Sequence, residues 1–107
     1  MSVIVTVSIS GDPERLEAYA AEHPDAMRAV VDLARGHGLI AHRFYGSDPD
    51  RFMAIDEWPD QQSFQTFFQE AADDIQAIMG AAGVTSEPEV TFWRKLETRD
   101  DAGWDAS

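Results

Sequence analysis

A histidine and an aspartate in two neighbouring segments could form a proton-accepting pair. His42 lies in LIAHRFYG (39–46) and Asp56 lies in RFMAIDEW (51–58). An aspartate beside a histidine orients the imidazole ring and raises its basicity. The two residue types therefore suggest general-base chemistry, provided that the fold brings them together.

The register of two strands decides whether this pair forms. The turn residues SDPD (47–50) predict a β-hairpin over 39–58 with a loop of about four or five residues. One register sets His42 directly opposite Asp56, and a shift by one residue sets it opposite Ile55 instead. The sequence is compatible with both registers. If the two residues meet, the alternative to a catalytic role is a structural one, as a cross-strand polar pair at the edge of the sheet.

Two tyrosines are further candidates for the site. Tyr45 shares the other face of the same strand with Arg43, where its hydroxyl could donate to a substrate oxygen or form the rim of an interface. Tyr19, in the first predicted helix, could reach a pocket from the helix side. The remaining histidines favour structural roles, because His23 precedes a proline at a helix boundary and His37 lies between two glycines in a turn.

The spacing of the three histidines does not predict a metal site. They show neither the i, i+4 nor the His-x-His arrangement that brings imidazoles to one ion. The chain has no cysteine, which excludes disulfides, thiolate nucleophiles and cysteine-ligated metals. It also lacks a glycine-rich phosphate loop. We therefore expect no metal and no other cofactor.

Charge and length limit the classes of partner. The chain has 107 residues, the size of one ordinary domain, and a formal net charge of −12 from 20 acidic and 8 basic residues. Such a surface repels phosphate backbones and anionic lipids, so we expect neither nucleic-acid nor membrane binding. No apolar run approaches the ~20 residues that span a bilayer, and the first ten residues do not resemble a secretory signal. A cytoplasmic protein is expected.

The order of the predicted elements indicates a fold. They are a strand over 3–9, a helical region over 12–36 interrupted at Pro24, strands over 39–46 and 51–58, a helix over 60–79 and a strand over 89–97. This βαββαβ order predicts a ferredoxin-like α+β fold, in which a four-stranded antiparallel sheet carries two helices on one face. One domain is expected over 1–97, followed by a polar tail over 98–107.

The uncovered face of this sheet predicts an interface. Two helices cover only one face, so the other exposes its apolar side chains to water or to a partner, and a patch of that size usually marks an interface. We therefore expect a homodimer through the sheet face. On the covered side, Phe64, Phe67 and Phe68 follow helical spacing and are expected mainly in the core.

The corner after the third predicted strand carries a family resemblance. Glu57-Trp58 ends the hairpin, and Ser63 and Phe64 begin the next helix. Together with the β-branched first strand, this pattern resembles the antibiotic biosynthesis monooxygenase-like proteins of the dimeric α+β barrel superfamily, over about residues 2–97 and most specifically over 51–68. The resemblance implies a homodimer with an apolar pocket between sheet and helices, for which the expected lining residues are Tyr19, Phe44, Trp58, Phe64, Phe67 and Phe68.

The resemblance also implies chemistry. Some such proteins oxygenate electron-rich polycyclic phenols with O2 and without metal or flavin, which requires an apolar pocket, one base and hydrogen-bond donors. Others degrade haem with an asparagine on the first strand and a tryptophan and a histidine on the second helix. This chain has no asparagine, Phe67 stands near the place of that tryptophan, and 60–79 has no histidine, so haem degradation is not expected.

The function expected from the sequence is a cofactor-independent monooxygenase that acts on a small aromatic or polyketide-like substrate. His42, Asp56 and Tyr45 are its expected catalytic residues. Two alternatives remain open at this stage: a non-catalytic dimeric domain that binds a small molecule or acts as a scaffold, and an isomerase or cyclase that uses the same pocket. The fold itself does not choose among them.

Overall fold

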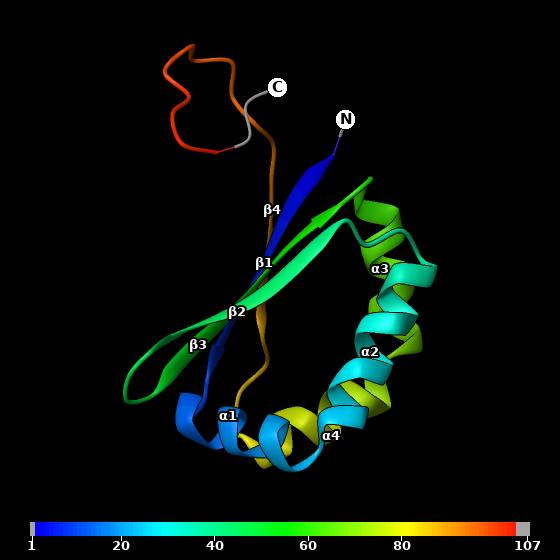
Figure 1. Ribbon diagram of the computed structural model, residues 1–107, viewed down its shortest axis with the longest axis vertical. Helices are drawn as coiled ribbons and strands as arrows, with labels where there is room; N and C mark the ends of the chain where they lie inside the picture. Colours follow the sequence, from blue (N-terminus) through cyan, green and yellow to red (C-terminus); the bar gives the residue numbers. More distant parts are fainter. Residues whose placement is uncertain (1, 105–107) are drawn as a thin grey trace.

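The computed structural model describes residues 2–104 and contains one antiparallel sheet with its helices on one face (Figure 1). Its elements are β1 (Val3–Ser10), α1 (Pro13–Glu22), α2 (Pro24–Gly36), β2 (Ala41–Ser47), β3 (Arg51–Trp58), α3 (Gln61–Glu70), α4 (Ala72–Ala81) and β4 (Glu89–Trp93). The strands are ordered β2-β3-β1-β4. The predicted ferredoxin-like fold is therefore confirmed, with each helical connection divided into two helices.

Strand alternation separates a buried face of the sheet from an open one. In β1, Val5, Val7 and Ile9 are buried on the helix side, and the residues between them are more exposed. β1 has two neighbours, because it pairs with both β3 and β4. Its many β-branched residues suit this central position, since they pack well on a pleated surface.

The hairpin has a shorter loop than the sequence predicted. Ser47 pairs with Arg51, so three residues join β2 to β3. The strand expected from residue 39 begins at Ala41, because the backbone N–H of Leu39 donates to the carbonyl of Ala34 at 3.1 Å and so closes the end of α2. This capping contact holds the chain near the helix before the strand starts.

The single helix predicted over 60–79 is wrong, because α3 and α4 meet at Ala71. This residue is fully buried and has φ −90° and ψ 5°, outside the helical range. Asp73 and Asp74 then lie in the first turn of α4, where carboxylates interact favourably with a helix N-terminus. The break redirects the chain, so that α3 packs on β3 and α4 packs on α1.

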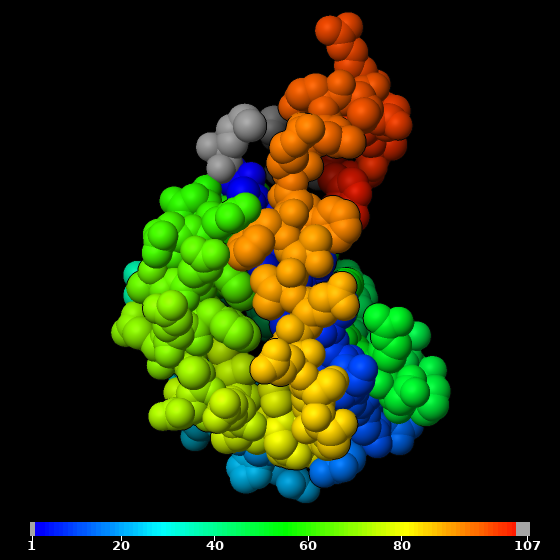
Figure 2. Space-filling model, turned by 180° about the vertical axis from the view of Figure 1, so that it is seen from behind, coloured from blue at the N-terminus to red at the C-terminus, as the bar shows by residue number. Residues whose placement is uncertain are grey.

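The last strand is also shorter than predicted, because it ends at Trp93 rather than at residue 97. Trp93 pairs with Ile4, and β1 begins one residue earlier, at Val3, so the following residues have almost no strand to pair with. Residues 94–104 leave the sheet and project beyond the body of the molecule (Figure 2). Of the tail predicted over 98–107, residues 105–107 lie outside the described residues.

A strand-to-helix corner follows β3 and anchors the core. Trp58 is fully buried, and its ring lies 5.8 Å from that of Phe64 and 5.3 Å from that of Phe67. Asp60 caps α3 by accepting a hydrogen bond from the backbone N–H of Ser63 at 2.8 Å. That bond holds the pKa of Asp60 below its usual value. Within 2–104, none of the helices is both long and apolar enough to cross a membrane.

Candidate functional site

The register of the hairpin brings His42 and Asp56 together. They are direct partners across β2 and β3, and Nδ1 of His42 lies 2.6 Å from Oδ1 of Asp56. Of the two registers that the sequence allowed, this is the one in which the pair forms. Both side chains lie on the helix side of the sheet, where Asp56 is only 7% exposed.

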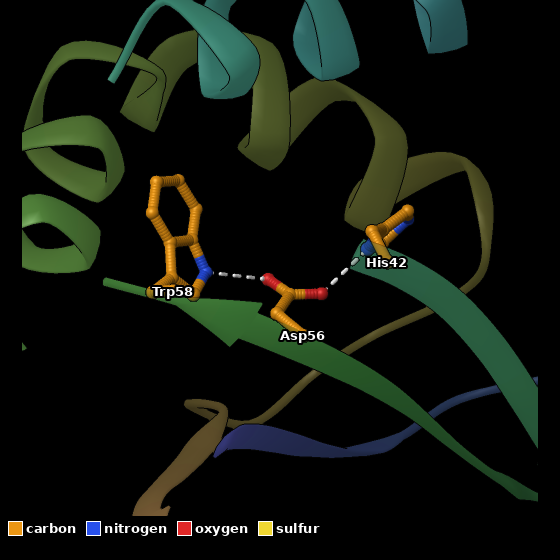
Figure 3. A network of polar contacts seen from close by, with 3 residues as sticks. All are labelled: His42, Asp56 and Trp58. Carbon is orange, nitrogen blue, oxygen red and sulfur yellow. Dashed lines mark hydrogen bonds and ion pairs between the residues drawn. The ribbon is translucent and has the colours of Figure 1, made fainter. Parts of the chain in front are cut away.

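Trp58 supplies a second partner for the same carboxylate. Its indole Nε1–H donates to Oδ2 of Asp56 at 3.2 Å, so each carboxylate oxygen has its own hydrogen-bond donor. Figure 3 shows the chain of contacts from Trp58 through Asp56 to His42. Because Asp56 and Trp58 are two residues apart on one strand, their side chains share a face. A buried carboxylate is tolerated when its oxygens are bonded in this way.

The hydrogen bond to Asp56 assigns a role to each nitrogen of the neutral His42 ring. An ionised carboxylate can only accept hydrogen bonds, so the neutral ring carries its proton on Nδ1 and directs it to Asp56. Nε2 then keeps a free lone pair. The ring of Phe44 meets the imidazole edge-on, with centroids 5.0 Å apart, and a quarter of the His42 side chain remains exposed. The arrangement can accept a proton at Nε2 and stabilise the resulting imidazolium.

A cavity of about 420 Å³ lies between the sheet and the helices, and the His42–Asp56 pair forms part of its wall. Its size falls within the usual range for small-molecule sites. Among the described residues that line it, only Arg28, His42 and Asp56 have polar side chains. Arg28 extends from α2 and is largely exposed, at 3.4 Å from Asp25. The cavity is therefore an apolar space with few polar groups.

The structure brings four of the six expected lining residues to this cavity: Phe44, Phe64, Phe67 and Phe68. Trp58 is not among the lining residues, because its indole is enclosed by the rings of α3 and reaches the site only through Asp56. Tyr19 does not line the cavity either. It packs against the ring of His23 at the α1–α2 boundary, with centroids 4.5 Å apart.

Tyr45, expected to be catalytic, is placed away from the His42–Asp56 pair. It lies opposite Met53, on the face of the sheet that the helices leave open, and 49% of its surface is exposed. The guanidinium of Arg43 stands over its ring at 5.5 Å. Strand alternation is the reason, since Tyr45 is one residue from Phe44 and must point to the opposite side.

The other two histidines occupy structural positions. His37 ends α2 and forms an ion pair through Nε2 with Glu70 of α3. His23 lies between α1 and α2, and its backbone N–H donates to the carbonyl of Tyr19 at 2.8 Å. Across residues 2–104, no group of three or more histidine, aspartate or glutamate side chains is arranged to hold a metal ion.

Sequence reasoning missed two features of the site. The hydrogen bond from Trp58 to Asp56 was not predicted, although their i, i+2 spacing on a strand was the available signal. The contribution of α2 was also missed. Met27, Val30 and Val31 line the cavity, and their i, i+3, i+4 spacing on one helix face was the available signal.

The open four-stranded sheet with helices on one face defines a ferredoxin-like α+β protein with a cavity between its layers, and comparisons with solved structures agree on the fold. No family model matches the chain, and no curated protein shows significant sequence similarity to it. The monooxygenase ActVA-Orf6 of Streptomyces coelicolor, in complex with nanaomycin D, is 14% identical, with a TM-score of 0.67 over 89% of this chain and 88% of that one. SnoaB of Streptomyces nogalater, a cofactor-independent oxygenase solved as a mutant, is 13% identical, with a TM-score of 0.64 over 94% and 98%.

The same fold also occurs in a protein with no stated activity. A conserved protein of Methanosarcina mazei is 18% identical, with a TM-score of 0.60 over 90% of this chain and 94% of that one. The chain therefore has the fold of the antibiotic biosynthesis monooxygenase-like structures, as its sequence resemblance implied. At these identities the likeness shows the fold alone, so the chemistry must be argued from the residues of this chain.

Proposed function

We propose that this protein is a cofactor-independent monooxygenase that acts on an electron-rich polycyclic phenol. The observation that carries the proposal is the position of the His42–Asp56 pair in the wall of an otherwise apolar cavity of about 420 Å³. A base of fixed orientation is what proton abstraction requires, and an apolar enclosure suits a flat aromatic ligand. Among the similar structures, SnoaB is named a cofactor-independent oxygenase, and ActVA-Orf6, named a monooxygenase, holds nanaomycin D.

The reaction begins with transfer of a substrate proton to Nε2 of His42. Asp56 keeps the ring in the receptive tautomer and stabilises the imidazolium that forms, while Trp58 holds the carboxylate in place. The apolar walls exclude water around the substrate anion. For an anthrone, the anion then reduces O2: the substrate loses its two methylene hydrogens and gains one oxygen atom, and the second oxygen atom leaves as water. Four electrons pass from substrate to O2.

We also propose that two copies associate through the open face of the sheet. On the two inner strands this face carries Ile4, Met53 and Ile55, with Thr6 opposite Ile55 and Ser8 opposite Met53. On the edge strands it carries Tyr45 and Trp93, which are about half exposed. Apolar side chains that cross several strands form the kind of patch that commonly marks an interface. Trp93 is already oriented, because its Nε1–H donates to Oγ1 of Thr6 at 2.8 Å.

Oxygen uptake with dithranol, a dihydroxylated anthrone, tests the enzymatic proposal. The dialysed wild-type protein, with a chelator present, should consume one O2 for each quinone formed, faster than the uncatalysed reaction. His42→Gln should lower the rate by about 10²–10⁴-fold, the usual contribution of a positioned base. His37→Gln is the matched control, because this histidine is ion-paired outside the cavity and should leave the rate nearly unchanged.

The outcomes separate the alternatives. Dithranol binding without oxygen uptake would make the protein a ligand-binding domain, and conversion of a phenolic substrate without oxygen uptake would indicate an isomerase or a cyclase. Equal rates for the wild type and His42→Gln would remove the histidine from the mechanism. Loss of activity in both histidine variants would point to general destabilisation, and thermal unfolding of each variant would show this directly.

A further inference from the structure

A second hollow of about 270 Å³ lies beside the cavity, at the hairpin end of the sheet. Its walls come from the first half of α1, the end of β2, the start of β3 and the loop that joins these strands, and they include Leu16, Glu17, Tyr45, Asp48 and Phe52. Among the described residues, Phe44 alone lines both spaces. Its side chain therefore stands between the cavity that holds the His42–Asp56 pair and the second hollow.

The surroundings of Phe44 make it a partition rather than a fixed part of the core. The ring is only partly buried, and it meets two other rings edge-on: His42 at 5.0 Å and Phe52 at 6.1 Å between centroids. Its strand, β2, is at the edge of the sheet and has a neighbour on one side only. No other described residue lines both spaces, so the ring of Phe44 is the wall that they share.

The two spaces differ in chemistry. The larger cavity is almost entirely apolar, whereas the second hollow has polar and apolar surface in similar amounts and includes the carboxylates of Glu17 and Asp48. Glu17 and Asp48 are exposed acidic residues that can attract a cationic group, whereas the guanidinium of Arg43 stands over the ring of Tyr45, which also lines the hollow. A ligand that occupies both spaces would combine an aromatic body with an amine-bearing end.

We propose that Phe44 determines the length of ligand that the site accepts, and that the second hollow is an accessory subsite for an ammonium-bearing substituent. The inference rests on the proposed function only in taking the larger cavity as a site for polycyclic aromatics. While the ring stays in the observed position, it limits binding to the aromatic body. Displacement or truncation of the ring opens the subsite to a substituent of about three to four bonds, consistent with the size of the hollow.

Calorimetric titration with three quinone ligands tests the proposal without relying on turnover. The ligands are dihydroxyanthraquinone, the same ring system with a propyl chain, and the same ring system with an aminopropyl chain. The test variant is Phe44→Ala, with Phe44→Leu as a second variant that removes less volume. The matched control is Phe68→Ala, because Phe68 is also a partly buried aromatic residue of the larger cavity, stacked on Phe64 at 5.2 Å, but does not line the second hollow.

The affinity for the propyl ligand is divided by the affinity for the bare ring system in each protein. This ratio should be about tenfold higher in Phe44→Ala than in the wild type, because each buried methylene contributes a factor of about four at most. Phe68→Ala should change the affinities for all three ligands alike. The aminopropyl ligand should gain more than the propyl ligand in Phe44→Ala, and Glu17→Gln in that background should remove the difference. Equal ratios in the two alanine variants would overturn the role of Phe44.

Failure of the proposed function gives a different pattern. If the bare quinone binds neither the wild type nor Phe68→Ala, the larger cavity is not an aromatic site, and both proposals fall together. If the bare quinone binds but the chain brings no gain in either Phe44 variant, only the partition is overturned. If Phe44→Ala gains affinity for the propyl and aminopropyl ligands, and Glu17→Gln changes neither affinity, the ammonium preference is overturned.

Discussion

Replacement of Asp56 by asparagine should move the proton of His42 from one ring nitrogen to the other. In the wild type, Oδ2 of Asp56 accepts from Trp58 and Oδ1 accepts from Nδ1–H of His42. An asparagine has one oxygen and one amide nitrogen in these positions. If its oxygen stays with Trp58, the amide donates to Nδ1, which must then be unprotonated, and the proton moves to Nε2.

The indole of Trp58 decides between the two orientations of the amide. With the oxygen towards Trp58, both hydrogen bonds are kept. With the amide reversed, two donors face each other and the indole N–H is left without a partner in a fully buried position. An unsatisfied buried donor costs about 1–3 kcal/mol, which disfavours the reversed amide by roughly five- to 150-fold. The free lone pair of Nε2 is thereby lost, and the rate should fall by about 10²–10⁴-fold.

Nitrogen NMR of the histidine rings measures this change without any substrate. Long-range proton–nitrogen correlations at a pH where the rings are neutral distinguish the two tautomers directly. The wild type should show a protonated Nδ1 at His42, and Asp56→Asn should show a protonated Nε2. The signals of the other two histidines should not change, because neither of them contacts Asp56.

A second substitution provides the rescue. Trp58→Phe removes the indole donor, so in the double variant with Asp56→Asn the amide can reverse, accept from Nδ1–H and restore the original tautomer. Truncation of this fully buried side chain costs stability, about 1–3 kcal/mol for a partial loss of volume, and the double variant should still fold. Unchanged ring signals in Asp56→Asn, or no reversal in the double variant, would refute the proposed division of roles between Trp58 and Asp56.

Three further outcomes concern assembly and stability. Ile55→Asp on the open sheet face should convert a dimer to a monomer in analytical ultracentrifugation, whereas Gln76→Asp on the exposed side of α4 should not. Gly83→Ala should lower the free energy of unfolding, because φ is +75° there and the new Cβ would meet a side chain, whereas Gly80→Ala, with open space in α4, should raise it by up to about 1 kcal/mol in urea titrations. Asp60→Ala should lower the melting temperature at neutral pH, and the difference between variant and wild type should shrink as the pH falls below 3.8, the ordinary carboxylate pKa. The hydrogen bond that lowers the pKa of Asp60 stabilises the ionised carboxylate, so its contribution to stability is lost when the carboxylate is protonated. Equal differences at both pH values would contradict the capping role.

The sequence contained more information on the hairpin register than the two open alternatives suggest. Phe52, Ala54 and Trp58 alternate on one face of β3 and must face the helices. In the observed register, Phe44 joins them. A shift by one residue would instead place Arg43 under the helices, and a buried guanidinium without a partner is costly. The charge of Arg43 thus favours the register that forms the pair.

Other errors had causes that no local pattern reveals. The break at Ala71 involves neither glycine nor proline, and it arises because α3 and α4 pack on different elements. The end of β4 at Trp93 is set by the length of β1, a strand more than eighty residues away in the chain. Both are tertiary effects that override local propensity. The position of Tyr19 differs, because its contact with the ring of His23 joins residues i and i+4 at the end of α1, a spacing that was visible in the sequence.

The inner face of β3 gives the strongest argument that the site has a function. Its four inward residues are Phe52, Ala54, Asp56 and Trp58, and all four are buried. Replacement of Asp56 alone would leave the donors of Trp58 and His42 unpaired, but replacement of all three residues together by apolar side chains of similar volume is neutral or stabilising in many proteins. Stability alone therefore does not account for this buried polar network. A carboxylate that accepts from an indole on one side, and that orients an imidazole in a cavity wall on the other, is what the proposed proton transfer requires.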